Sequence, residues 1–272
     1  MAGPVLDRFC GFYTGYKVQP YGASEICRVA GEQMDEGRQC MADLLGVDRG
    51  CVTIGPSTTQ NINTLSLAAS RMITAGTAVI VTGQDHEANI GAWERLCQRN
   101  GAELRTWAVD PEGELRLDAL EPLVDDRVRI LCMTHSSNIV GSINPVEEVI
   151  RRVRPLGVRV VVDGVSFAPH SWPDIPLLKP DAYCFSTYKT YAPHLGIMYV
   201  AESFARDLDP QCHYFNLEHP EKRFDAAGPD HASIAALAGL GDYFAASHQH
   251  HFGNSDDNLY QRTQAVSGLM NQ

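Results

Sequence analysis

The chain has 272 residues, of which 44% are hydrophobic and 20% charged, so it can bury a sizeable core in one large domain or two small ones. Its formal net charge of -11, without a long run of like charges, argues against a nucleic-acid partner, because a phosphate backbone requires a basic face. No apolar run reaches the roughly 18 residues of a membrane span, and the N-terminus lacks the basic and apolar regions of a signal peptide, so we expect no membrane partner.

Apolar runs typical of strands alternate with stretches of helical pattern from residue 51 onwards. This alternation predicts an α/β fold with a largely parallel sheet that is covered by helices on both faces. Strands are expected at residues 51–54, 78–82, 103–108, 128–134, 158–163, 181–186 and 196–200. Helices are expected at residues 62–73, 89–99, 117–123, 145–153, 233–248 and 257–269, with a long loop or crossover at about 203–232.

The eight cysteines are widely and irregularly spaced, and no two form a CxxC pair. This spacing favours neither a metal site nor a disulfide framework. We therefore expect reduced cysteines in a cytoplasmic protein, since disulfides are rare in that compartment.

Polar and ionisable residues recur where the predicted strands end. In an open α/β sheet, ligands bind at the carboxyl ends of the strands, so these residues are candidates for a binding site. The simpler alternative is that loops are polar in any protein. The candidates are Thr58 and Thr59, Asp85 and His86, Asn138, Asp163 and Ser166, and Ser186, Tyr188 and Lys189.

Lys189 has the most suggestive surroundings of the four lysines. It follows an apolar strand and has Phe185, Tyr188 and Tyr191 close by in the sequence. A partly buried lysine can serve as an amine nucleophile toward an aldehyde. The alternative is a structural lysine whose ammonium group reaches solvent beside aromatic rings.

Asp163 ends the apolar run VRVVVD and precedes Gly164. A carboxylate at the end of a buried strand requires a cationic partner or several hydrogen bonds. A protonated pyridine nitrogen would be such a partner. The alternative is a helix N-cap for the next segment.

The hydroxyls of Thr58 and Thr59, together with free N–H groups at a helix start, could hold an anion. Ser186, which lies three residues before Lys189, could donate to the same anion. The alternative for the threonines is plain N-capping. His86 could stack on an aromatic ring or move protons, although a single histidine is more often a hydrogen-bonded loop residue.

Six motifs contain these positions in order: STTQNIN, DHEANIGAW, THSSNIVGSINP, VVDGVSFAPH, FSTYKTYAPHLGIMYV and RFDAAGPDH. Over about residues 50–235 the chain thereby resembles the class V aminotransferase family of fold-type I pyridoxal 5'-phosphate (PLP) enzymes, and within it the cysteine desulfurase-like group. The resemblance implies a fold-type I large domain with a mainly parallel seven-stranded sheet flanked by helices. It also implies a PLP cofactor, an amino acid substrate and a homodimer.

The resemblance also implies individual roles. Lys189 would bind PLP as a Schiff base and later move the substrate α-proton, Asp163 would pair with the pyridine nitrogen, and His86 would stack on the ring. The other cofactor-binding positions would be Asn138 and Ser166 near the phenolic oxygen, and Thr58, Thr59, Ser186 and Tyr188 at the phosphate.

Some positions depart from the family pattern. Ser166 stands where cysteine desulfurases usually carry a glutamine, Tyr188 where many relatives carry a histidine, and Gly228 where many carry a threonine that reaches the phosphate of the neighbouring subunit. We expect residues 1–22 to be part of an N-terminal strap, 23–235 the PLP-binding large domain, and 236–272 the helical start of a C-terminal small domain that is otherwise missing.

The expected function is that of a PLP-dependent enzyme that cleaves the C–S bond of an amino acid. The alternatives are a class V aminotransferase or epimerase, or a non-catalytic protein that keeps the PLP fold. A nucleotide-binding α/β protein is disfavoured because neither GxGxxG nor GxxxxGK[ST] follows a predicted strand.

Overall fold

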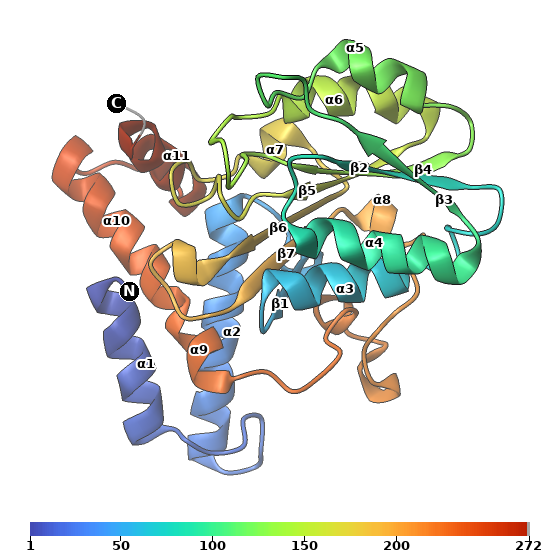
Figure 1. Ribbon diagram of the computed structural model, residues 1–272. Helices are drawn as coiled ribbons and strands as arrows, with labels where there is room; N and C mark the ends of the chain where they lie inside the picture. The colour runs from blue at the N-terminus through green and yellow to red at the C-terminus, as the bar shows by residue number, and fades with distance from the viewer. Residues whose placement is uncertain (271–272) are drawn as a thin grey trace.

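The computed structural model describes residues 1–270, in which a seven-stranded sheet lies between layers of helices (Figure 1). The strand order is β1-β7-β6-β5-β4-β2-β3, and all neighbours are parallel except that β7 runs antiparallel to both β1 and β6. The strands are β1 (Val52–Gly55), β2 (Ala78–Thr82), β3 (Glu103–Trp107), β4 (Val128–Thr134), β5 (Arg159–Asp163), β6 (Ala182–Ser186) and β7 (Gly196–Val200).

Helices α3 and α4 cover one face of the sheet, α5, α6 and α7 cover the other, and the helices from the two ends of the chain gather beside it (Figure 1). The longer helices are α1 (Gly3–Gly15), α2 (Glu25–Leu45), α3 (Thr58–Ala68), α4 (Glu87–Asn100), α6 (Val146–Val153), α10 (Ala238–Phe252) and α11 (Leu259–Met270). The shorter ones are α5 (Leu117–Leu120), α7 (Ile175–Leu178), α8 (Glu202–Ala205) and α9 (His231–Ala236).

The central strands are buried on both faces, which explains their continuous apolar sequences. In β5, Val161 belongs to the core under α3 and α4, whereas Val160 and Val162 belong to the core that α2 and α6 help to form. Side chains alternate between the faces of a strand, so a run of valines supplies both cores at once. This arrangement fixes β5 in the middle of the sheet and places its last residue, Asp163, at the carboxyl edge.

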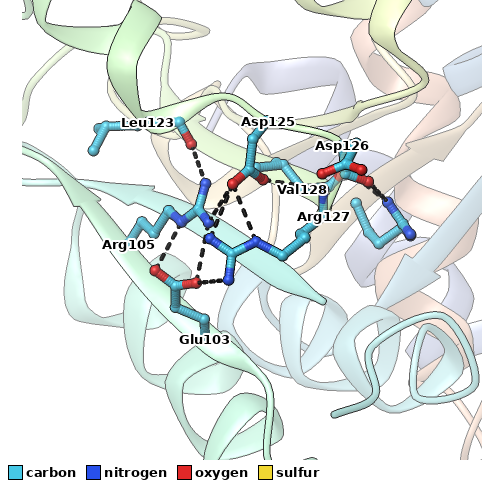
Figure 2. Close-up of polar contacts among 8 residues, drawn as sticks. Glu103, Arg105, Leu123, Asp125, Asp126, Arg127 and Val128 are labelled. Atoms are coloured by element: carbon cyan, nitrogen blue, oxygen red, sulfur yellow. Dashed lines mark hydrogen bonds and ion pairs between the residues drawn. The ribbon is translucent and has the colours of Figure 1, made fainter. Parts of the chain in front are cut away.

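The outer strand β3 is stabilised by a cluster of ion pairs (Figure 2). The guanidinium of Arg105 bonds to Glu103 at 2.9 Å and to Asp125 at 2.8 Å, and it also donates to the carbonyl oxygen of Leu123 at 2.6 Å. Arg127 bonds to the same two carboxylates, each at 2.9 Å. Charges along an edge strand disfavour pairing with a strand of another molecule.

The predicted α/β fold with its mainly parallel seven-stranded sheet is confirmed, and each predicted strand differs from the observed one by no more than a residue at either end. The helix predicted at residues 62–73 instead begins at Thr58, because the hydroxyl of Ser57 caps the helix by accepting a hydrogen bond from the amide of Gln60 at 3.1 Å. Helices α1 and α2 were not predicted.

The proposed division into residues 1–22, 23–235 and 236–272 stays a prediction. Helix α1 lies within the first segment and packs against α9 and α10, while α10 and α11 also pack against α2. Within residues 1–270, no helix has the length and apolar character needed to cross a membrane.

Candidate active site

The carboxyl ends of β2, β4, β5 and β6 meet at one edge of the sheet, where α3 and α4 begin. Every site residue predicted from the sequence lies at this edge: Asp163 and Ser186 are the last residues of their strands, and the others lie in loops, turns or helix starts. Because β7 is antiparallel, its first residue, Gly196, also lies here, paired with Ser186 at the end of β6. The topology therefore brings together residues that are more than 100 positions apart in the chain, such as Thr58 and Ser186, whose hydroxyl oxygens are 2.8 Å apart.

Lys189 ends a short 3-10 turn, Thr187–Lys189, directly after β6. The turn is fixed from both sides, because the amide of Thr187 donates to the carbonyl oxygen of Leu195 at 2.9 Å and that of Thr190 to Thr187 at 2.8 Å. Tyr191 then adopts a left-handed conformation with φ 70°, which is rare for a bulky residue and common at functional sites. The lysine is half-buried on a rigid turn, as a precisely placed amine requires.

Lys189 lines a cavity of about 470 Å³ together with residues of two other loops. One of these loops follows β4 and contributes Asn138. The other follows β5 and contributes Ser166 and Phe167. The predicted neighbours of the phenolic oxygen thus share one cavity with the predicted lysine.

Asp163 is 4% exposed and accepts a hydrogen bond at Oδ1 from the amide of Val165 at 2.9 Å. Burial raises the pKa of this carboxyl group, and the smaller opposing effects come from that hydrogen bond and from the charges of His86 and Lys189. Within residues 1–270, no arginine, lysine or histidine forms an ion pair with it. A buried carboxylate of this kind is suited to receive a cation from a ligand.

The start of α3 is where the sequence predicts a site for an anion. Thr58 and Ser186 are both 4% exposed, and the hydrogen bond between their hydroxyls joins the helix to the end of β6. The first N–H groups of a helix have no partner within the helix and carry a partial positive charge. Thr59, the next residue, is exposed. The hydroxyls of Thr58 and Ser186 therefore lie at the helix start that carries these amides.

Tyr188 lies at the exposed rim of this region, with 48% of its surface accessible. Its ring stacks on that of His194, with centroids 4.6 Å apart and planes inclined by 6°. His194 in turn bonds through Nδ1 to the carbonyl oxygen of Pro56 at 3.1 Å, just before α3. The phenol of Tyr188 therefore lies next to an imidazole, which sequence reasoning had not singled out.

His86 is the N-cap residue of α4, and its Nδ1 accepts a hydrogen bond from the amide of Ala88 at 3.1 Å. The ring is exposed, and its charge contributes to the electrostatic environment of Asp163. The stacking of this imidazole on a planar ligand stays a prediction.

Asp85 is a site residue to which the sequence assigned no role. It is 8% exposed and accepts hydrogen bonds from Thr82 Oγ1 at 2.5 Å and from Asn89 Nδ2 at 2.9 Å. Burial raises the pKa of this carboxyl group to about 7, and the charge of Asp163 also raises it. Its position after an apolar strand and before His86 was the available signal.

Comparison with known proteins identifies the relationship. The sequence profile of the family Aminotransferase class-V matches residues 2–269. A cysteine desulfurase of Salmonella newport (strain SL254) is 35% identical over 210 residues, which are 76% of this chain and 52% of that protein. The chain thus spans about half the length of the curated relatives it matches.

Solved structures share the fold. The S-sulfonic acid form of the cysteine desulfurase CsdA from Escherichia coli has a TM-score of 0.77 at 23% identity, covering 95% of this chain and 66% of that one. A lysine-to-alanine mutant of C-DES, with glycine covalently linked to its PLP cofactor, has a TM-score of 0.78 at 18% identity, covering 97% of this chain and 71% of that one. At these identities the likeness shows the fold alone.

The residues at the carboxyl edge fit PLP. A lysine lines the cavity, a buried carboxylate lacks a cation, and a helix start with two hydroxyls can hold a phosphate. The profile match over nearly the whole chain and the 35% identity to cysteine desulfurases show that the chain belongs to the aminotransferase class-V family, whose cofactor is PLP.

Proposed function

We propose that this chain is the cofactor-binding part of a PLP-dependent enzyme that cleaves the C–S bond of an amino acid, with Lys189 as the residue that binds PLP covalently. The observation that carries the proposal is Asp163, a carboxylate 4% exposed that has no cationic partner within residues 1–270. An unpaired buried charge is costly, and a protonated ring nitrogen would remove that cost. The charge of Lys189 also lowers the pKa of Asp163, against the larger effect of burial.

PLP supplies an electron-poor ring that stabilises negative charge at the substrate Cα when it is bound. Asp163 would keep the proton on the ring nitrogen, because an anionic carboxylate favours the protonated form of its partner. Lys189 Nζ would be the base that takes the α-proton of the substrate. His86 would cover one face of the ring and exclude water from it.

The phosphate end is held by groups of a different kind. The α3 amides and the hydroxyls of Thr58, Thr59 and Ser186 would bind the phosphate oxygens, and the Tyr188 hydroxyl would donate from the rim. Asn138 and Ser166, which line the cavity with Lys189, would hold the phenolic oxygen of the ring.

The names of the relatives support C–S cleavage as the reaction. A second candidate is another class V reaction, transamination or epimerisation of an amino acid, and Ser166 favours it because cysteine desulfurases usually carry a glutamine at that position. We also propose a cytoplasmic homodimer. The apolar side chains of Ile139, Val140 and Ile143, which are 80%, 54% and 67% exposed near the cavity, are suited to be covered in an assembly.

Reconstitution tests this proposal. Purified protein is incubated with PLP, and the visible absorbance band of lysine-bound cofactor is recorded for the wild type, Lys189→Ala and the control Lys17→Ala. Lys17 is exposed and lies beside Tyr13, away from the cavity. We expect the band in the wild type and in Lys17→Ala, and its loss in Lys189→Ala. A band that persists in Lys189→Ala would refute the linkage.

The reaction is tested by measuring alanine and sulfide released from cysteine. Release that depends on PLP and on Lys189 supports C–S cleavage. Keto-acid formation or racemisation without sulfide would support the second candidate. Cofactor binding without turnover of any amino acid would contradict the enzymatic proposal and favour a non-catalytic protein.

A further inference from the structure

A buried group of three rings lies against the segment that follows β5. Nδ1 of His135 and the hydroxyl of Tyr183 are 2.8 Å apart, and the two residues are 6% and 0% exposed. The His135 ring stacks on Phe167, with centroids 3.5 Å apart and planes inclined by 13°. Phe167 itself lines the cavity that contains Lys189. The three rings therefore connect the interior of the sheet to the wall of the candidate active site.

The same residues contact the backbone around Asp163. The amide of His135 donates to the carbonyl oxygen of Asp163 at 2.8 Å, and Thr134 Oγ1 donates to that oxygen at 3.3 Å. A Cβ atom at Gly164 would lie 2.2 Å from the hydroxyl oxygen of Tyr183, so this glycine is needed for the tyrosine to reach across β5. The backbone that carries the Asp163 carboxylate is therefore held from the β4 side by Thr134 and His135, and Tyr183 of β6 packs against Gly164.

Burial keeps both members of this pair uncharged. Burial lowers the pKa of His135 to about 4, and burial raises the pKa of Tyr183 well above its ordinary value. At neutral pH the imidazole is uncharged and the phenol keeps its proton, so the two groups share a hydrogen bond between neutral partners. This hydrogen bond restrains the ring orientation of His135, and Phe167 stacks on that ring.

We propose that Tyr183 and His135 are positioning residues that hold the segment from Asp163 to Phe167 so that the Asp163 carboxylate meets the ring nitrogen of the cofactor. This inference rests on the proposed function, since it requires PLP in the cavity. Neither residue reaches the reacting atoms in this account. Their effect passes through the backbone of Asp163 and the stacked ring of Phe167.

The experiment compares the affinities of PLP and of 1-deazapyridoxal 5'-phosphate, which has carbon in place of the ring nitrogen. Both compounds keep the aldehyde and the phosphate, so the ratio of their dissociation constants reports the contact of the ring nitrogen with Asp163. The variants are Tyr183→Phe, the double variant Tyr183→Phe/His135→Phe, and Asp163→Asn as the reference for complete loss. Tyr199→Phe is the matched control, because it removes a phenol hydroxyl from β7, in the same sheet.

We expect the wild type and Tyr199→Phe to prefer PLP. In Tyr183→Phe and in the double variant that preference should fall by roughly three- to tenfold, as the loss of one buried hydrogen bond predicts. The double variant leaves no buried partner unsatisfied and keeps a ring stacked on Phe167, so it provides a folded protein if the single variant is unstable. Melting temperatures of the cofactor-free proteins separate folding from positioning.

An unchanged preference for PLP in Tyr183→Phe and in the double variant would overturn the inference. This includes the case in which the affinities for PLP and for the deaza compound fall by the same factor, because such a loss indicates a purely structural role. The proposed function fails differently. If the wild type binds PLP no better than the deaza compound, or binds neither, Asp163 does not pair with the ring nitrogen.

Discussion

Replacing Gly196 by alanine would place a methyl group inside the start of α3. The Cβ atom at this position would lie 2.2 Å from the carbonyl carbon of Ser57 and 2.5 Å from the amide nitrogen of Thr58. Both are backbone atoms and cannot rotate away as a side chain could, so β7 and α3 must separate. Overpacking of this kind costs about 1–3 kcal/mol of the free energy of unfolding.

Urea denaturation of the cofactor-free protein measures this loss, and Gly228→Ala is the matched control because a Cβ there would have no heavy atom within 4 Å. We also expect Gly196→Ala to weaken PLP binding more than pyridoxal binding, since the displaced amides belong to the proposed phosphate site and pyridoxal lacks the phosphate. If Gly196→Ala is as stable as Gly228→Ala and keeps the wild-type ratio of the two affinities, the close approach of β7 to α3 does not shape the phosphate site.

Three further outcomes are expected. Thr58→Val should weaken PLP binding by roughly tenfold, consistent with the loss of a hydrogen bond to a charged group, and leave pyridoxal binding unchanged. If equilibrium titrations show that the affinities for PLP and for pyridoxal fall equally, Thr58 does not bind the phosphate. The pKa of Asp85 is raised from 3.8 to about 7, so the folded state binds the extra proton and stability should fall as pH rises through this range. Asp85→Asn should flatten that part of the curve of unfolding free energy against pH, and an unaltered slope would refute the assignment. Arg105→Met should lower the melting temperature more at low salt than at high salt, because it removes the central guanidinium of the ion-pair cluster on β3 (Figure 2). The same decrease in melting temperature at every salt concentration would contradict this prediction.

The central strands could be predicted from the sequence because each is a short apolar run buried on both faces, whereas the edge strand β3 mixes polar and apolar residues. Helix α2 could not, because its buried face includes Gly31, Gly37 and Arg38 beside the apolar residues, and these weaken the helical pattern of hydrophobicity. Gly37 is needed there because a Cβ would lie 2.0 Å from the carbonyl oxygen of Ile234 in α9, a contact that only the folded chain creates.

Some residues of the candidate site could likewise be predicted from the sequence, and others could not. Lys189, Asp163 and Thr58 could be proposed because each follows a strand, where the topology of the sheet gathers ligand-binding groups. Tyr183 could not, since it lies within an apolar strand and its role depends on the pairing of β5 with β6. His135 gave no signal either, because its contacts with Tyr183 and Phe167 join residues from three separate segments.

The most direct test of the central claim is to incubate the protein with PLP, reduce it with borohydride, digest it and locate the modified lysine by mass spectrometry. We predict that the reduced cofactor is found on Lys189 and that Lys17, Lys179 and Lys222 are unmodified. Modification of another lysine, or of none, would contradict it.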